Sequence, residues 1–314
     1  MLRIGLRRAA MAVPILLGVT VIVFLLMTVL PGDPAAAFIG EATSAQEIAK
    51  IRDELGLNDP LSVRYAHWLV DAATGDLGYS PYRRRDVTDL LAQAWINTAI
   101  LAGCSAVLGL VGGVVLGFAA GVRRGRLTDR VISAASLTGL SIPSFFVAIL
   151  MLILFSAKLG VLPSGGAVLD QGPLVFLRHL LMPMVAGSLA TMAITARVTR
   201  ASIVQTYAAD FVQTLRAKGL GTVEILRHVL KNAISPVLTT SGLQIGYLLG
   251  GSVLVETIFR WPGMGMLVFS AISARDLLVV QGATLVIALT FVLVNLIVDL
   301  LQATIDPRLR RAVA

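Results

Sequence analysis

The sequence is poor in charged residues and in cysteine. Asp, Glu, Lys and Arg make up only 14% of the 314 residues, whereas soluble domains are about a quarter charged. The deficit predicts an apolar solvent, and the lipid bilayer is the obvious one. The single cysteine, Cys104, stands inside an apolar run. One cysteine excludes a disulfide framework or a cysteine metal site within the chain, and indicates a buried, inert residue.

The sequence also lacks the motifs of nucleotide binding and catalysis. The phosphate-binding Walker A pattern needs Gly-Lys followed by Ser or Thr, and none of the lysines follows a glycine. The three histidines, His67, His179 and His228, are far apart, and no apolar stretch carries paired carboxylates. We therefore expect no enzymatic site, no metal and no cofactor in this chain. Any ATP and Mg²⁺ must be bound by partner subunits.

The positive charge does not indicate a nucleic-acid partner. The formal net charge is +8, which in a soluble protein would suggest DNA or RNA binding. Here the basic residues lie beside apolar runs, a pattern that is typical of membrane topology.

Six apolar stretches are long enough to cross a bilayer, which takes about 20 residues per helix. They predict an all-α, polytopic membrane protein with six transmembrane helices. A seventh stretch, in the segment 257–276, is too short to cross and predicts an interfacial or re-entrant piece. The first stretch exceeds the length of a signal-peptide core, so we expect it to be retained. The expected spans are 9–32, 97–122, 131–157, 178–198, 236–256 and 277–301.

The basic residues predict the orientation. If the N-terminus lies inside, the segments 1–8, 123–130, 199–235 and 302–314 are cytoplasmic, and they hold most of the Lys and Arg. The positive-inside rule favours this arrangement. We therefore expect a bacterial inner-membrane protein with both termini in the cytoplasm and 33–96 outside.

The outer segment 33–96 is polar. Apolar residues at helical spacing predict short helices over 46–55 and 62–72, the second of which is stopped by Gly75. The run Arg83-Arg84-Arg85 predicts a solvated turn, and the docking of a partner is left open as its alternative role.

The cytoplasmic segment 199–235 predicts a helix, a glycine turn and a second helix. Asp210 with Gln213 resembles a capping box, and the first helix would run to Lys218. Gly219 and Gly221 would form the turn. A second helix, capped by Thr222 and continuing to Lys231, has an apolar stripe on one side and charges off that stripe. From these residues alone, an ordinary amphipathic linker at the membrane surface is an equal alternative.

Polar residues are rare near the spans and are candidates for a transport pathway, since such groups face a bundle interior or a water-filled cavity. Hydrogen bonding between helices is the competing explanation. Gly113 and Gly117 form a small-xxx-small face that predicts tight helix packing. Asp299 also lies at a span end, where water can solvate it. The pathway candidates are Asn97, Gln244, Tyr247, Glu256, Gln281 and Asn295.

The cytoplasmic segment resembles a known family. Residues 210–220, DFVQTLRAKGL, are similar to the EAA loop of ABC-importer permeases, and 227–236, RHVLKNAISP, continue the pattern. Further segments agree: LPGDP at 30–34, LGLNDP at 55–60, and GGSVLVETIF at 250–259 followed by WPGMG. Over nearly its whole length the chain resembles permease subunits of the peptide/nickel-type bacterial ABC importers.

This resemblance implies a type I ABC importer permease fold and a set of partners. These are a second homologous permease, two cytoplasmic ATP-binding subunits and an extracytoplasmic peptide-binding protein, with the surrounding lipid. The loop 199–235 would dock on the ATPase. The closing Leu-Pro of the general motif falls on Lys231-Asn232, which is a departure from it. The residues to which the resemblance assigns coupling are Gln213, Thr214, Leu215, Ala217, Lys218, Gly219, Thr222, Glu224, Arg227 and His228.

The expected function is the translocation of small peptides, with nickel or glutathione as alternative cargoes. A proton-coupled secondary transporter is the alternative from another class. It would need ionisable groups within the spans, and the apolar stretches from which the spans were counted contain no Asp, Glu, Lys or Arg. These stretches are 9–32, 90–122, 131–157, 179–196, 232–255 and 277–298. A membrane enzyme is disfavoured because convergent polar groups are lacking.

Overall fold

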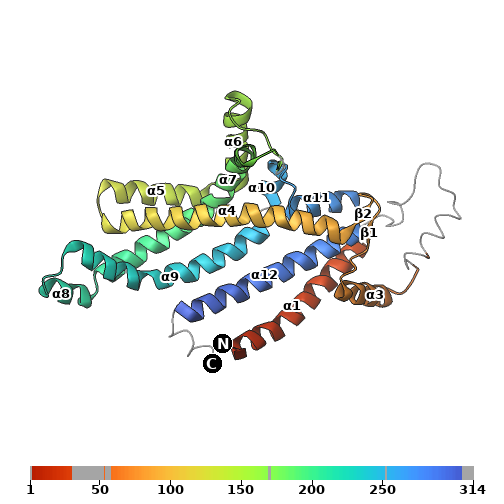
Figure 1. Cartoon of the computed structure of the whole chain (residues 1–314), viewed down its shortest axis with the longest axis horizontal. Coiled ribbons are helices and arrows are strands. Elements are labelled where there is room, and N and C mark those ends of the chain that lie inside the picture. Colours follow the sequence, from red (N-terminus) through yellow and green to blue (C-terminus); the bar gives the residue numbers. More distant parts are fainter. Residues whose placement is uncertain (1, 30–52, 54–57, 169–170, 252, 306–314) are drawn as a thin grey trace. The chain divides into compact units, whose positions relative to one another are not determined.

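The computed structural model describes residues 2–29, 53, 58–168, 171–251 and 253–305, and these are almost entirely helical (Figure 1). The expected all-α class is confirmed. The elements are α1 (Leu2–Val29), α3 (Leu61–Thr74), β1 (Tyr79–Ser80), β2 (Arg85–Asp86), α4 (Val87–Val122), α5 (Leu127–Ser141), α6 (Ser144–Met151), the π-helical segment η2 (Leu152–Lys158), α7 (Pro173–Tyr207), α8 (Asp210–Ala217), α9 (Thr222–Gly251), α10 (Val253–Ile258), α11 (Met264–Ala274) and α12 (Leu277–Ile305).

The chain forms two compact units. Unit 1 consists of Met1–Gly5, Ala99–Trp261 and Leu293–Ala314, and unit 2 consists of Leu6–Thr98 and Pro262–Val292. Each unit is described by itself below.

Within the described residues, three helices are long and apolar enough to cross a bilayer: Val87–Val122, Pro173–Tyr207 and Leu277–Val298. They coincide with the expected spans 97–122, 178–198 and 277–301. Two further spans, 9–32 and 236–256, extend into residues that the structure does not describe. The count of six spans therefore stays a prediction. The segment 257–276 contains the short apolar helix α11, which has 11 residues.

The stretch 131–157 is not one straight helix, contrary to expectation. It is divided into two parts, α5 and the continuous segment formed by α6 and η2. The second part is bent by 98° relative to the first. The bend lies at Ile142 and Pro143, both of which have extended ψ values. Proline has no backbone N–H, and its ring disfavours the helical conformation for the preceding residue. The Ile142-Pro143 pair is therefore a sequence signal for this break, but the prediction of one straight span used only the length of the apolar run.

Glycines bring α4 and α7 of unit 1 into close contact. Gly109, Gly113, Gly117 and Gly121 recur every fourth residue and so lie on one face of α4. Atoms of α7 occupy the space where each glycine's Cβ would stand. The predicted tight packing at Gly113 and Gly117 is thus confirmed, and it is formed within the chain.

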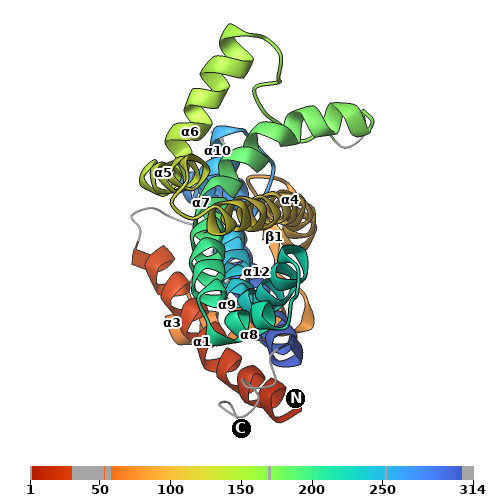
Figure 2. The same ribbon diagram turned by 90° about the vertical axis from the view of Figure 1, so that its left-hand side faces the viewer.

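Helix α9 runs alongside α7 in the same unit (Figures 1 and 2). The hydroxyl of Ser202 on α7 donates to the Ala233 carbonyl of α9 at 2.8 Å. An apolar cluster fills the end of this pair at which α8 packs against α9. Its buried members are Ile203, Val212, Ile225, Val229 and Ala233.

Unit 2 packs the start of α12 and the helix α11 against the first turns of α4. The predicted helix at 62–72 is confirmed as α3, which ends at the left-handed Gly75; the helix expected at 46–55 lies outside the described residues. The predicted turn at Arg83–Arg85 joins β1 to β2. Beside it, buried Asp276 accepts a hydrogen bond from Ser80, and burial raises the pKa of the Asp276 carboxyl.

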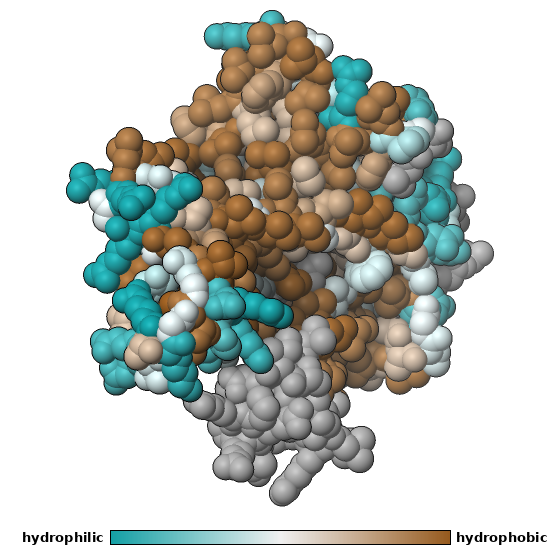
Figure 3. Space-filling view, turned by 60° about the vertical axis from the view of Figure 1, so that its left-hand side comes forward, coloured by the Kyte–Doolittle hydropathy of each residue, from teal (hydrophilic) through white to brown (hydrophobic). Residues whose placement is uncertain are grey.

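Much of the helical surface is apolar. Figure 3 shows hydrophobic residues covering most of the visible face, with hydrophilic residues gathered near its margins. On α4, Val107, Val111 and Val115 recur every four residues and are each about 60% exposed. Such a continuous exposed apolar stripe fits contact with lipid or with another membrane subunit rather than with water.

Candidate coupling surface and cavity

A glycine turn joins α8 to α9. The predicted glycine turn is confirmed at Gly219, whose φ of +79° lies in the left-handed region. The Gly219 N–H donates to the Arg216 carbonyl at 2.9 Å, and the Leu220 N–H donates to the Leu215 carbonyl at 3.2 Å. Together these bonds form a Schellman motif, which satisfies the last carbonyls of α8. Leu215 and Leu220 also pack against the apolar cluster beneath the turn.

The helix starts differ in detail from the expectation. Asp210 is the first residue of α8, after Ala209 at the N-cap, and no side-chain hydrogen bond caps the helix. The predicted capping box is therefore wrong; Asp210 instead places a negative charge in the first turn, which the helix dipole favours. At α9 the carboxylate of Glu224 accepts the N–H of Gly221 at 3.0 Å. Glu224, rather than Thr222, thus binds the free backbone donor.

Helix α9 does not end where the second loop helix was expected to end. It continues from Thr222 to Gly251 without a break and includes Pro236. The expected border between the loop 199–235 and the span 236–256 therefore does not coincide with a helix end; it falls inside α9. At 1.5 Å per residue, α9 extends for roughly 45 Å. One helix carries both the surface beside the glycine turn and the residues deep in unit 1.

The residues assigned to coupling form one side of this helix–turn–helix. Leu215 is half-buried, and the other nine are exposed: Gln213, Thr214, Ala217, Lys218, Gly219, Thr222, Glu224, Arg227 and His228. The opposite side is the buried apolar cluster. The element is thus held on one side by the helix pair and left open to a partner on the other.

Sequence reasoning missed one conspicuous member of this surface. Val223 is 81% exposed at the tip of α9. It lies off the apolar stripe of that helix, so an exposed apolar residue beside the turn was the available signal.

A cavity of about 390 Å³ lies in unit 1. Helices α4, α6, α7, α9 and α10 contribute its walls. Most of the lining is apolar, and four polar side chains face it: Ser105, Ser144, Thr191 and Gln244. Sequence reasoning named only Gln244, because hydroxyl residues are common in apolar helices and only the packing shows which of them face a cavity.

The other pathway candidates lie elsewhere. Glu256 is fully buried in unit 1 but is not among the residues that line the cavity. Asn295 is half-buried. In unit 2, Asn97 donates to the Pro262 carbonyl at 2.9 Å and Gln281 is buried. The side chain of Tyr247 lies outside the described residues. Among the pathway candidates whose side chains the structure describes, only Gln244 lines the cavity.

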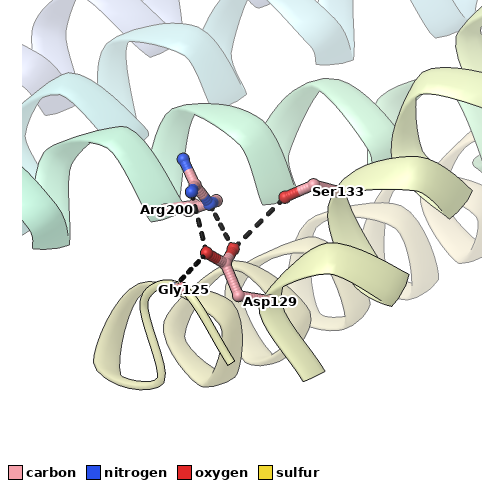
Figure 4. A network of polar contacts seen from close by, with 4 residues as sticks. All are labelled: Gly125, Asp129, Ser133 and Arg200. Atoms are coloured by element: carbon pink, nitrogen blue, oxygen red, sulfur yellow. Dashed lines mark hydrogen bonds and ion pairs between the residues drawn. The ribbon is translucent and has the colours of Figure 1, made fainter. Parts of the chain in front are cut away.

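An ion pair between buried Asp129 and partly exposed Arg200 fastens the start of α5 to α7 (Figure 4). Arg200 donates from Nε to Asp129 Oδ1 at 2.5 Å and from Nη2 to Oδ2 at 2.9 Å. Asp129 also accepts the Gly125 N–H at 2.9 Å and the Ser133 hydroxyl at 3.3 Å. These hydrogen bonds, with that from Arg200 foremost, hold the pKa of the Asp129 carboxyl well below its usual range. Sequence reasoning missed Asp129, because the segment 123–130 with its four arginines was used only to predict the membrane orientation.

The chain matches a described protein family over most of its length. Residues 113–311 match the binding-protein-dependent transport system inner membrane component family. Residues 1–101 match the N-terminal part described for such membrane components. The chain belongs to this family. The expected importer permease is thereby confirmed, and the alternative of a secondary transporter is set aside.

Individual relatives support the same assignment. The glutathione transport system permease protein GsiC of Escherichia coli (strain K12) and that of Salmonella typhi are each 40% identical over 311 residues, which is 99% of this chain and 99% of each relative. The resemblance to peptide/nickel-type permeases is confirmed by this match. The family is a transport component of the membrane, not a described enzyme.

A solved structure shares the fold. It is described as inward-facing conformations of the MetNI methionine ABC transporter, and it superposes with a TM-score of 0.54 at 17% identity. The match covers 69% of this chain and 96% of that one. The likeness confirms the ABC permease fold that the sequence resemblance implied.

Proposed function

We propose that this chain is the permease subunit of an ATP-driven inner-membrane importer of small peptides. Two cytoplasmic ATPase subunits, a second permease and an extracytoplasmic peptide-binding protein complete the complex. The termini and the loop 199–235 lie in the cytoplasm and 33–96 lies outside. The chain itself supplies no catalysis and binds neither ATP nor Mg²⁺.

The observation that carries this proposal is the continuity of α9. Its first turn lies beside Gly219 on the exposed surface, and Gln244 and Leu248 of the same helix line the cavity. Thr222 and Gln244 are 22 positions apart along the helix, or roughly 33 Å. A displacement of the ATPase against the exposed end is therefore delivered to the cavity by one rigid element.

Peptide is the favoured cargo, with glutathione included because it is itself a small peptide. Close relatives are named as glutathione permeases, and those names motivate testing that tripeptide first. Nickel is less well supported. Divalent transition metals prefer imidazole, thiolate or carboxylate ligands, and the described residues that line the cavity carry none of them.

The test is reconstitution of the full complex from this chain, a second permease, the ATPase subunits and the binding protein. We expect co-purification of the ATPase and ATP-dependent uptake of glutathione or a dipeptide into proteoliposomes. The isolated chain should bind no nucleotide. Uptake of Ni²⁺ but of neither peptide, by a fully assembled complex, would contradict the proposed cargo.

A further inference from the structure

The cavity of unit 1 holds an amide that bonds to none of the residues that the structure describes. The Gln244 side chain is 9% exposed and faces the cavity. Among the described residues it makes no hydrogen bond. Buried polar groups in native proteins are nearly always bonded, so such an amide needs an explanation in the form of water or a ligand. An amide aimed into a cavity of this size marks a binding position.

Two hydroxyls stand with it. Ser144 at the start of α6 and Thr191 on α7 line the same cavity, and neither bonds to another described residue. The methyl group of Thr191 lies against Gly109 of α4. Ser105 differs, because its hydroxyl already donates to the Met184 carbonyl at 3.2 Å. Three neutral polar groups from three helices thus remain available to a ligand.

The chemistry of these groups selects the ligand class. A glutamine amide both donates and accepts, which matches a peptide bond with its N–H and C=O. The lining residues in the described part of the chain include no charged side chain, so they can bond the neutral main-chain groups of a ligand but offer no ligands to a bare metal ion. The volume of about 390 Å³ falls in the range of small-ligand pockets.

We propose that this cavity binds the main chain of a small peptide in transit, with Gln244 exchanging hydrogen bonds with a peptide bond and with Thr191 and Ser144 beside it. This inference rests on the proposed function. The rest of the cavity wall is apolar and can accept different peptide side chains, because hydrophobic contacts depend on buried area and not on direction. Neutral hydrogen bonds are individually modest, so the peptide is oriented without being retained, as transport requires.

The experiment is a thermodynamic-cycle design that combines a change of Gln244 with removal of the peptide N–H from the ligand. Reconstituted complexes are given binding protein saturated with L-Ala-L-Ala or with L-Ala-N-methyl-L-Ala, which lacks the peptide N–H. The ratio of their initial uptake rates is measured in wild type and in Gln244→Met, which keeps the length of the side chain but removes the amide. Gln93→Met is the matched control, because Gln93 is exposed at the start of α4 and does not line the cavity.

We expect the preference for the unmethylated dipeptide to fall about fivefold in Gln244→Met, the factor expected of one neutral hydrogen bond. It should be unchanged in Gln93→Met. Effects of methylation on the binding protein are common to all variants and cancel in the comparison. If Gln244→Met fails to assemble, Gln244→Asn withdraws the amide by one methylene and should lose most of the same preference.

The two ways of failing differ. Normal dipeptide uptake with an unchanged preference in the Gln244 variant would overturn the binding role of the cavity and leave the importer intact. A wild-type complex that takes up no peptide would overturn the proposed cargo and this inference with it.

Discussion

The Cβ that Gly117 lacks would lie 2.3 Å from the backbone carbonyl oxygen of Ala196. Real Cβ atoms do not approach backbone that closely, so α4 and α7 can only reach their observed separation with glycine here. A second contact is also too close for a real side chain, because the same Cβ would stand 2.6 Å from Cβ of Thr199. Since α4 and α7 form two walls of the cavity, this contact helps to set the separation of Ser105 and Thr191.

Gly117→Ala should therefore destabilise the permease. Overpacking of a close helix contact costs about 1–3 kcal/mol, and here a carbonyl cannot rotate away. Gly103→Ala is the matched control on the same helix, since nothing lies within 4 Å of its Cβ; it should be neutral or stabilising by up to about 1 kcal/mol. Thermal unfolding of both purified complexes measures the difference. Equal melting temperatures would contradict the close approach.

The pair Asp129 and Arg200 should respond unequally to truncation. The side chain of Asp129 is 5% exposed and that of Arg200 is 34% exposed. Arg200→Ala leaves a buried carboxylate without its cation, which costs about 3–5 kcal/mol. Asp129→Ala leaves an arginine that water can still reach, and should cost about 2 kcal/mol. Measurement of the two melting temperatures checks the order, and a more severe Asp129 variant would refute it.

The same pair predicts a pH dependence. Because the folded-state pKa of Asp129 is depressed, its contribution to stability is fully present above the ordinary Asp value of about 4. It is lost as pH falls toward the depressed folded value. Stability curves of wild type and Asp129→Asn should therefore converge on acidification below about pH 4. A gap that widens there would mean that the carboxylate is not the stabilising form.

Gly219 should tolerate asparagine but not valine. A Cβ at this position meets no atom within 4 Å, so only the backbone conformation is at issue. The left-handed region costs about 1–2 kcal/mol for ordinary residues, more for β-branched ones, and little for Asn. Gly219→Val should displace the exposed start of α9 and uncouple ATP hydrolysis from uptake, whereas Gly219→Asn should keep both.

The controls for this prediction separate folding from coupling. Membrane insertion and substrate binding by the external protein should survive in Gly219→Val. Gly221→Ala tests the neighbouring glycine, whose φ is not positive and whose Cβ would stand 4.0 Å from Glu224, and it should be harmless. Wild-type uptake and stimulated ATPase activity in Gly219→Val would show that the element is only a linker.

Cysteine labelling checks the orientation. In a Cys104→Ala background, Arg124→Cys should be protected from an impermeant reagent added outside, and Ala73→Cys should be modified. Both positions are exposed. They are preferred to Gly125 and Gly75, whose positive φ values would strain a cysteine. The reverse labelling pattern would invert the topology.

The sequence by itself determined the fold class, the apolar stretches and the turn at Gly219. These follow from local composition: long apolar runs need a bilayer, and a glycine between two amphipathic helices ends the first of them. The family motifs in 210–236 likewise lie in one continuous segment. Short-range patterns of this kind are readable without knowing which helices meet.

Only the tertiary structure decided which residues act together. The continuity of α9 past Pro236 depends on packing against α7, and local signals had favoured a border there. Arg200 finds Asp129 across 71 positions, and Gln244 joins Thr191 at a cavity that several helices close. Such relationships depend on which helices meet and on their rotation. The glycine spacing on α4 predicts a close contact, but it does not name the partner helix or the side chains that the contact brings together.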